Sequence, residues 1–451
     1  MHTLRGIRHA TRGREIAALS FGSQLDGMVA AKEDGEPLWP ALIWADRRAG
    51  EECEAAAARG GRARLRELTG CNLDPGHIAP KIAWLARHEP EAHAATAVFA
   101  CPGAWVAWRA TGVLAVDATN ASSTGLLDPR TREWAPEACE AFEVEPDRLP
   151  PVHRADAVLG PALPWLRDAT GLDEHTVVVL GAGDEMAATL GAGVVEPGVV
   201  CDVMGTAEPV CAVVAEPAQD ATGLVELHPH ADPDTWLLEN PGWLSGGAYR
   251  WFRDELGGPE TLRAAESGAD VYELLDELAE CAPPGAGGVS WLPALAGAMA
   301  PEWNAHARAA WFGMTAAHGR AHLARALLEG NALALRDVIE AIAGAGHAPT
   351  MVVCVGGGAK GRLLCELRAH ITGLPVCVPD DVETTARGAA MLAAAGAGLH
   401  PSVAAAGKAM AGPRGEPFEP DPELRELYDG LHRRHRRLYE ALRPLFDGAA
   451  A

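Results

Sequence analysis

No run of apolar residues in the 451-residue chain is long enough to cross a lipid bilayer. The first 22 residues also lack the apolar core of a secretory signal peptide. These absences predict a cytoplasmic protein with no membrane partner. The formal net charge of −23 further disfavours nucleic acids as partners, because an acidic surface repels phosphates. A small-molecule partner is therefore expected.

Cysteine occurs, but never as a Cys-x-x-Cys pair. The ten cysteines are scattered along the chain, without the spacing of a metal site or a disulfide scaffold. We therefore expect reduced thiols and assign no residue as a metal ligand.

Two nucleotide-binding motifs are also missing. No glycine-rich turn continues into the Lys-Ser/Thr of a Walker motif, and none matches the G-x-G-x-x-G dinucleotide fingerprint. The second absence makes a dehydrogenase a distant alternative.

Strand-like and helix-like segments alternate throughout, which predicts an α/β fold. The length suits two domains, and the break at "GVVEPG" (193–198) divides the chain into domains 1–193 and 194–451. Segment 113–134 is predicted to be extended, and 198–214 to form two strands around Gly205 and Thr206. A long helix is expected at 318–345, and a strand, glycine loop, helix and strand at 350–378.

Three glycine-rich turns follow predicted strands, at Gly181–Gly183, Gly205–Thr206 and Gly356–Ala359. Glycine lets backbone N–H groups approach a ligand, and a helix N-terminus favours phosphate. Tight strand–helix packing explains any single turn equally well. Asp184 follows the first turn and is either a helix cap or a general base that accepts a proton from an attacking hydroxyl.

An early polar cluster adds a second candidate site. Gln24, Asp26, Trp44, Asp46 and Arg48 fall at predicted strand ends and turns. Such side chains suit the hydroxyls of a polyol, which need both donors and acceptors. An Asp-Gly turn with surface ion pairs accounts for the same residues.

The chain resembles the FGGY carbohydrate kinases, and xylulokinases in particular. The motifs that carry the resemblance run in order along nearly the whole chain: "GSQLDG" (22–27), "ALIWADRR" (41–48), "PGHIAPKIAWL" (75–85), "DATNASSTGLLD" (117–128), "GAGDEMAATLGAGVVEPG" (181–198), "MGTAEPV" (204–210), "LSGGAYRWFRD" (244–254), "ARAAWFGM" (307–314), "GGGAK" (356–360) and "ETTARGAA" (383–390).

This resemblance implies two actin-like, ribonuclease-H-like domains flanking a cleft, the first binding sugar and the second nucleotide. It implies transfer of the γ-phosphoryl group of ATP, with Mg²⁺, to a sugar hydroxyl, D-xylulose before others. Asp184 would be the catalytic base, and the small residues after it would leave room for the reactants. The implied sugar neighbours are Gln24, Leu25, Asp26 and Glu185. The implied nucleotide site comprises Gly205, Thr206, Gly246, Gly357, Gly358, Ala359 and Arg362.

Three departures from the family pattern keep alternatives open. The family's opening Asp-x-Gly-Thr hairpin is missing here, so the first domain is expected to be N-terminally truncated, with reduced stability or activity. Asp26 stands where xylulokinases tend to have His, and Glu185 replaces the usual Asn or Gln. The alternatives are a catalytically inactive sugar- or nucleotide-binding relative, and a kinase for ribulose, glycerol or another ketose or polyol. A homodimer is left open.

Overall fold

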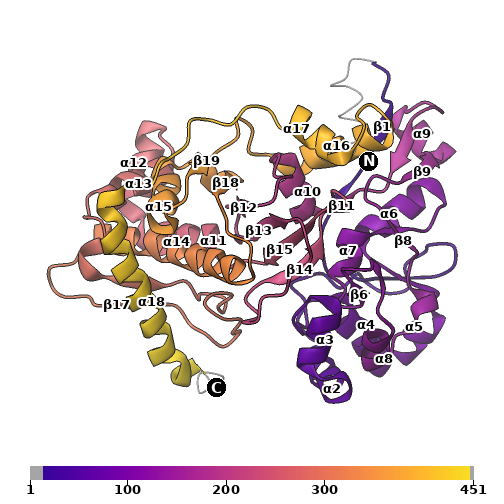
Figure 1. Cartoon of the computed structure of the whole chain (residues 1–451), viewed down its shortest axis with the longest axis horizontal. Coiled ribbons are helices and arrows are strands. Elements are labelled where there is room, and N and C mark those ends of the chain that lie inside the picture. The colour runs from indigo at the N-terminus through magenta and orange to yellow at the C-terminus, as the bar shows by residue number, and fades with distance from the viewer. Residues whose placement is uncertain (1–13, 447–451) are drawn as a thin grey trace.

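The computed structural model describes residues 14–446 and has two lobes. Figure 1 shows the first lobe, mostly purple, beside a larger lobe in pink to yellow. None of the helices in residues 14–446 is both long enough and apolar enough to span a membrane. The expected boundary at residue 193 falls between helix α10 (Asp184–Gly191) and strand β12 (Val199–Val203), and the domain division stays a prediction.

The first lobe consists of short strands and helices around a core that includes Met28, Ile82 and Phe142. Its strands are β1 (Ala18–Leu19), β2 (Gly22–Ser23), β3 (Val29–Ala31), β4 (Val98–Ala100), β5 (Val116–Asp117), β6 (Leu127–Asp128), β7 (Glu133–Trp134), β8 (Val152–His153), β9 (Val158–Pro161), β10 (Val177–Val179) and β11 (Ala182–Gly183). Its helices are α2 (Gly50–Gly60), α3 (Arg62–Thr69), α4 (Ile78–His88), α5 (Pro90–Ala95), α6 (Pro102–Thr111), α7 (Ala118–Ser122), α8 (Pro136–Phe142), α9 (Pro164–Thr170) and α10.

The expectation that 113–134 consists of extended pieces joined by polar turns is wrong at 118–122, where helix α7 forms. Asp117 causes the interruption. Its carboxylate accepts hydrogen bonds from the backbone N–H groups of Thr119 and Asn120, both at 3.0 Å, and so caps the helix.

The second lobe is built on a six-stranded sheet with the order β14-β15-β13-β12-β18-β19. Parallel pairing joins β12 to β18 and β18 to β19, and the other neighbours are antiparallel. Its strands are β12, β13 (Val210–Val214), β14 (Glu226–Pro229), β15 (Trp236–Asn240), β18 (Met351–Val355) and β19 (Val376–Cys377), with a separate hairpin of β16 (Ser290–Leu292) and β17 (Ala310–Phe312). Its helices are α11 (Gly246–Leu256), α12 (Gly258–Ser267), α13 (Val271–Glu280), α14 (Arg320–Gly344), α15 (Arg362–Thr372), α16 (Thr384–Gly396), α17 (Val403–Met410) and α18 (Arg425–Phe446).

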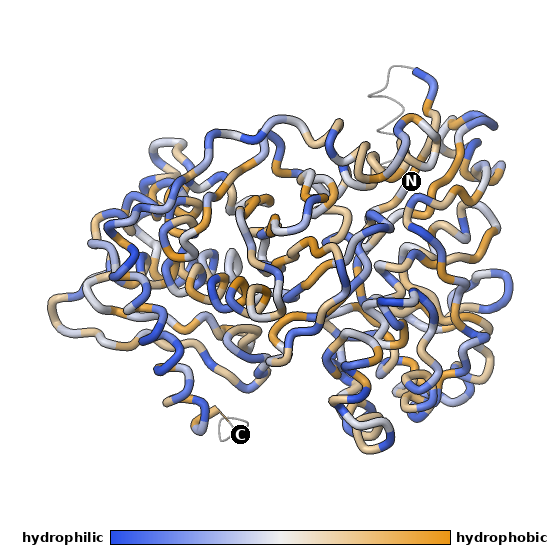
Figure 2. Tube along the Cα trace, viewed as in Figure 1, coloured by the Kyte–Doolittle hydropathy of each residue, from blue (hydrophilic) through white to orange (hydrophobic). Residues whose placement is uncertain are grey.

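Both faces of this sheet are buried, as expected for apolar strands whose side chains alternate between faces. Val200 faces a layer that contains α14 and α15, whereas Cys201 faces a layer that contains α10, α16 and α17. Figure 2 shows hydrophobic stretches in the central strands and a mainly hydrophilic α18. The predicted strand pair at 198–214, the helix at 318–345 and the strand–loop–helix–strand order at 350–378 are confirmed.

Helix α10 packs closely on α16. A Cβ atom added at Gly191 would lie 1.9 Å from the Thr384 carbonyl oxygen, and one at Gly388 would lie 1.9 Å from that of Ala187. Only glycine allows the backbones to approach so closely. These small residues therefore serve helix packing, whereas the sequence interpretation had them make room for reactants.

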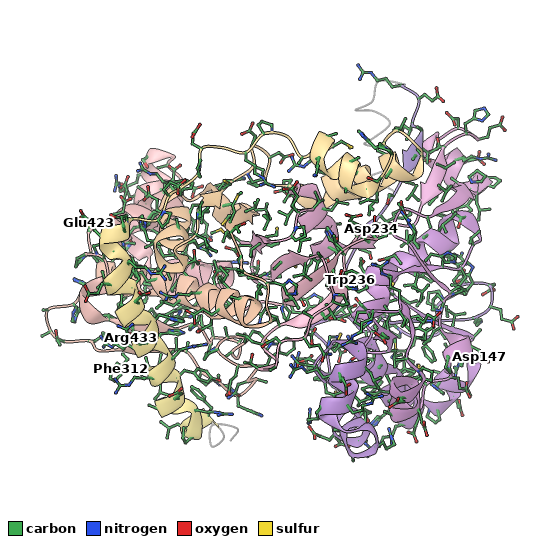
Figure 3. All side chains as sticks on the ribbon, in the orientation of Figure 1. Asp147, Asp234, Trp236, Phe312, Glu423 and Arg433 are labelled. Atoms are coloured by element: carbon green, nitrogen blue, oxygen red, sulfur yellow. The ribbon has the colours of Figure 1, made fainter. Side chains whose placement is uncertain are left out.

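Side chains and backbone also join the two lobes. Trp236, labelled near the lobe junction in Figure 3, donates its indole N–H to the Pro129 carbonyl at 2.8 Å. The Arg132 guanidinium lies over the Trp236 ring, 5.2 Å from its centroid. Asn72 donates to the Gly223 carbonyl at 2.9 Å. These contacts hold the first lobe against β15 and the loop that precedes β14.

Candidate active site

Asp184 is the first residue of α10, directly after strand β11. Strand β11 pairs in parallel with β2, which places Gly183 opposite Ser23 and brings the turn at Leu25 and Asp26 beside the start of α10. A Cβ atom on Gly183 would lie 2.3 Å from Leu25 Cδ2. Glycine before the acid therefore lets the two loops meet.

A buried network fixes the position of this acid. Gly183 donates its backbone N–H to Thr119 Oγ1 at 2.8 Å, and the Thr119 hydroxyl donates to the Asp117 carboxylate. Asn120 donates to the other Asp117 oxygen at 2.6 Å and accepts from the Ser23 hydroxyl at 3.2 Å. Asp117 thus orients both loops that flank Asp184.

The electrostatics of the site favour protonated carboxyl groups. Burial raises the pKa of Asp184, although hydrogen bonds from the backbone, including that of Leu25, oppose the shift. The pKa of Glu185 is raised well above its ordinary value, first by burial and then by the charges of Glu239 and Asp184. Burial and the neighbouring carboxylates thus favour the neutral form of Glu185.

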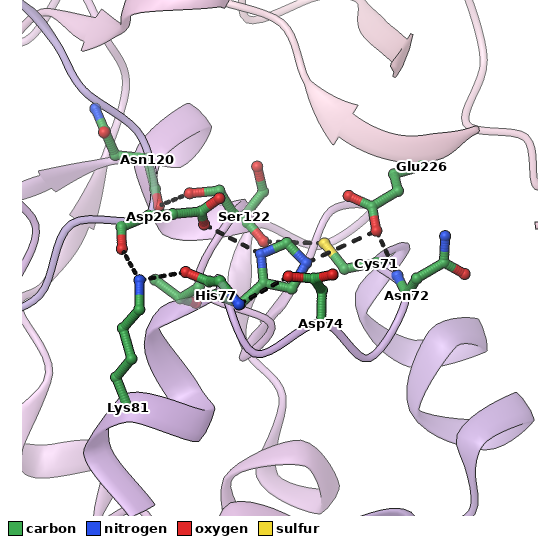
Figure 4. A network of polar contacts seen from close by, with 12 residues as sticks. Asp26, Cys71, Asn72, Asp74, His77, Lys81, Asn120, Ser122 and Glu226 are labelled. Carbon is green, nitrogen blue, oxygen red and sulfur yellow. Dashed lines mark hydrogen bonds and ion pairs between the residues drawn. The ribbon is translucent and has the colours of Figure 1, made fainter. Parts of the chain in front are cut away.

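Asp26 has a left-handed backbone, with φ of 60°, which non-glycine residues rarely adopt. Lys81 stabilises it: its buried ammonium group donates to the carbonyls of Asp26 at 2.7 Å, Ile43 at 2.8 Å, and Gly76. Figure 4 shows the contact of Lys81 with the Asp26 carbonyl and the hydrogen bond of 3.1 Å between the Asp26 carboxylate and His77 Nδ1. Burial lowers the pKa of Lys81 to about 8.

Replacing Lys81 by methionine is expected to lower the free energy of unfolding by about 3 kcal/mol, because three carbonyls lose a charged donor. Chemical denaturation of K81M beside wild type measures the change. The exposed Lys32 provides the matched control, and K32M is expected to stay within about 0.5 kcal/mol of wild type. A K81M protein as stable as K32M would contradict this role.

A chain of buried ionisable groups continues from Asp26 into the second lobe. His77 Nε2 lies 3.7 Å from Glu226 Oε1, and His228 Nε2 lies 3.4 Å from both Glu226 Oε2 and Glu239 Oε2. Burial alone would lower the pKa of His228, but the two carboxylates raise it to about 9. This series of ionisable groups continues from Glu239 to Glu185, which is next to Asp184.

A cavity of about 530 Å³ lies at the carboxyl ends of the parallel strands β12 and β18. Gly205, Thr206, Gly246, Gly357 and Gly358 line it together. Gly358 donates its backbone N–H to the Met204 carbonyl at 2.9 Å, which brings two of the glycine turns together. A Cβ atom on Gly246 would lie 2.3 Å from the Gly205 carbonyl oxygen, so this wall requires glycine.

Comparisons with known proteins agree with this arrangement. Residues 3–191 match the N-terminal domain of the FGGY family of carbohydrate kinases, and residues 202–397 match its C-terminal domain. The chain belongs to the FGGY family of carbohydrate kinases.

Individual FGGY kinases resemble this chain along most of its length. An autoinducer-2 kinase of Escherichia coli is 33% identical over 440 residues, covering 96% of this chain and 82% of its own. A xylulose kinase of Bacillus subtilis is 31% identical over 392 residues, covering 87% and 76%. The crystal structure of ligand-bound xylulose kinase from Lactobacillus acidophilus has the same fold, with a TM-score of 0.90, 24% identity and coverage of 99% and 88%.

In this FGGY kinase the sequence-predicted residues form two groups. Leu25, Asp26, Asp184 and Glu185 gather at the β2–β11 loops, and Gln24 is partly exposed just before their turn. Two predicted nucleotide-site residues, Ala359 and Arg362, do not line the glycine-lined cavity. Ala359 is buried beside it, and the exposed Arg362 pairs with Glu366 at 2.7 Å.

Sequence reasoning missed several polar residues of the cavity. Arg250 donates to the Thr206 hydroxyl at 2.9 Å, and Tyr249 donates to Asp276 at 2.7 Å. Burial raises the pKa of Asp276 to about 6. The pattern "GGAYR" gave the only local signal, because Arg250 follows Gly246 by one helical turn.

Proposed function

We propose that this FGGY kinase transfers the terminal phosphoryl group of ATP, with Mg²⁺, to a hydroxyl of D-xylulose, with Asp184 as general base. The observation that carries the proposal is that Asp184, Asp26 and Glu185 lie together in the first lobe. They follow the ends of the paired strands β2 and β11. The relationship to the Bacillus subtilis xylulose kinase supports the choice of sugar.

Asp184 has one chemical task in this proposal. Its carboxylate accepts the proton of the substrate hydroxyl as that oxygen attacks phosphorus. The Asp117–Thr119 network holds the loop of Asp184 in place, so the base does not have to be ordered during the reaction. Gln24 and Asp26 supply an amide and a carboxylate for the other hydroxyls.

The glycine-lined cavity of the second lobe fits the donor. Its backbone-rich wall at Gly205, Gly246 and Gly358 allows close approach of phosphates, and its volume suits a nucleotide. ATP, when bound, supplies the phosphoryl group. We propose the first lobe as the sugar-binding domain and the second as the nucleotide-binding domain, and we assign no protein ligand to Mg²⁺.

A second candidate substrate is autoinducer-2. The observation in its favour is the 33% identity to an autoinducer-2 kinase over 96% of this chain. The carboxylate of Asp26 accepts hydrogen bonds where xylulokinases tend to have His, which alters the set of hydroxyls that the site prefers.

A coupled assay of ADP release tests both substrates. Purified chain with ATP and Mg²⁺ is screened with D-xylulose, ribulose, glycerol, gluconate and autoinducer-2. We expect the highest kcat/KM with D-xylulose and a sugar-dependent turnover lowered about 10²–10⁴-fold in D184N. A kcat/KM at least tenfold higher for another compound would replace D-xylulose as the substrate.

Glu185 provides a separate prediction on pH. Its carboxyl group is protonated when folded but ionises above about pH 4.5 when unfolded, so rising pH favours unfolding. Glutamine does not ionise. E185Q is therefore expected to gain stability over wild type as pH rises from about 4.5 towards alkaline values. Denaturation across this pH range measures the difference, and a constant difference would contradict the assignment.

A further inference from the structure

Two buried glutamates face each other on the edge strand β14 of the large sheet and its neighbour β15. Glu226 on β14 and Glu239 on β15 are directly opposite in the antiparallel register, and both are at most 4% exposed. Like charges opposite one another destabilise a sheet, and burial makes the repulsion stronger. His228 lies two residues after Glu226, on the same face of β14. The arrangement requires positive charge between the carboxylates.

The spacing of these groups is that of metal ligands. His228 Nε2 is 3.4 Å from one oxygen of each glutamate, whereas charge-assisted N–H···O bonds measure about 2.7–2.9 Å. Ligands bonded to zinc at about 2.1 Å in a tetrahedron lie about 3.4 Å apart. One oxygen of each glutamate and the imidazole nitrogen lie within 4.8 Å of one another.

Hydrogen bonds orient the His228 ring. The Ser122 hydroxyl donates its proton to the Thr119 carbonyl at 2.8 Å, so its oxygen accepts from His228 Nδ1, also at 2.8 Å. The ring therefore directs Nε2 at the two carboxylates. Metal-ligating histidines are commonly oriented through the opposite nitrogen in this way.

A second histidine points at the same carboxylate from the other lobe. His77 is 7% exposed, and its Nε2 has no hydrogen-bond partner within residues 14–446. This nitrogen faces Glu226 Oε1 at 3.7 Å, as Figure 4 shows, while Nδ1 is engaged by Asp26. A buried nitrogen aimed at a carboxylate without a hydrogen bond is the second sign of a cation site.

We propose that Glu226, His228 and Glu239 bind a Zn²⁺ ion. Mixed imidazole and carboxylate ligands at tetrahedral spacing favour zinc over magnesium or calcium, which prefer oxygen ligands and larger coordination numbers. The ion neutralises the cross-strand glutamate pair. Glu226 also faces His77, which binds Asp26, so the ion acts on the architecture of the sugar site without joining the chemistry.

Zinc binding to the untagged full-length chain tests this site independently of kinase activity. Protein stripped with EDTA is titrated with Zn²⁺ against a chromophoric competitor, and bound zinc is measured by mass spectrometry. We expect about one zinc per chain, with affinity reduced at least about tenfold in H228Q and E239Q. S122A keeps every ligand and is expected to lose about 10- to 100-fold in affinity through misorientation of His228.

His230 provides the matched control, because it is a buried histidine just beyond β14 whose Nδ1 pairs with the Thr235 hydroxyl at 3.0 Å. H230Q is expected to bind zinc as wild type does. Zinc should also raise the melting temperature of wild type but not of H228Q.

Absence of zinc binding to folded wild type would overturn the proposal and leave His228 as an imidazolium between two carboxylates. Equal affinity in wild type, E239Q and S122A would overturn it as well. S122A keeps the test decisive if the ligand variants do not fold.

Discussion

Substitution of Asp184 by asparagine is expected to lower kcat by about 10²–10⁴-fold, the usual contribution of a general base. Asparagine keeps the size of the side chain but cannot accept the hydroxyl proton. The nucleotide cavity is formed by other residues, so ATP affinity is expected to stay within about twofold of wild type. Steady-state kinetics with D-xylulose and equilibrium ADP binding measure the two effects separately.

The pH dependence of the wild type gives a second signature of Asp184. Burial raises the pKa of this carboxyl group, and only the ionised form acts as base. Activity should therefore fall as pH is lowered through that raised pKa, and D184N should lose this acidic limb. E185Q is the neighbouring control. Equal turnover of D184N and wild type, or loss of ATP binding with turnover, would contradict the assigned role.

Substitution of Arg368 by methionine is expected to lower the free energy of unfolding by about 3–5 kcal/mol. The Arg368 guanidinium is 2% exposed and donates to Asp202 at 2.6 Å and to Glu208 at 2.7 Å. Both acids are fully buried. Methionine would leave two carboxyl groups in the core of the second lobe without a cation.

The loss of stability in R368M should depend on pH. Burial raises the pKa of Glu208 to about 8, against the opposing effect of Arg368, so removal of Arg368 favours the protonated acid still more. The unfolded acids ionise above about pH 4.3. Glu208 stays protonated in both folded proteins up to about pH 8, so the deficit relative to wild type is expected to stay constant to that pH and to grow above it.

Arg362 is the matched control for Arg368. It lies on the same helix, its side chain is 81% exposed, and it pairs with Glu366 at the helix surface. R362M is expected to change stability by less than about 1 kcal/mol. An R368M protein within that range, or a deficit that does not change with pH, would show that the buried ion triad is not required for stability.

The sequence predicted well where each signal was local. Segments 198–214 and 350–378 contain apolar strands bounded by glycine turns, and both folded as expected. The fold class and the kinase family followed from ordered motifs along the whole chain, and the comparisons confirm both. Helix α7 was missed because its signal in the sequence is a single capping residue, Asp117. The apolar residues around it gave a stronger signal for extended structure.

These local sequence patterns did not predict the contacts between distant segments. Asp26 and Glu226 are separated by 200 positions, yet His77 contacts both. The absence of paired cysteines gave no hint of the proposed zinc ligands, since these are two glutamates and a histidine on two neighbouring strands. The small residues of α10 were expected to leave room for reactants, and only the approach of α16 showed that Gly191 serves helix packing.

The sequence alone determined the α/β fold class, the family and the glycine turns, because strand periodicity, turn residues and motif order are properties of neighbouring positions. Only the tertiary structure decided which charges face one another: the β2–β11 pair, the β14–β15 register and the meeting of two lobes. The physical reason is that burial, hydrogen-bond partners and pKa values depend on groups brought together through space, and no spacing along the chain encodes which partner a buried carboxylate finds.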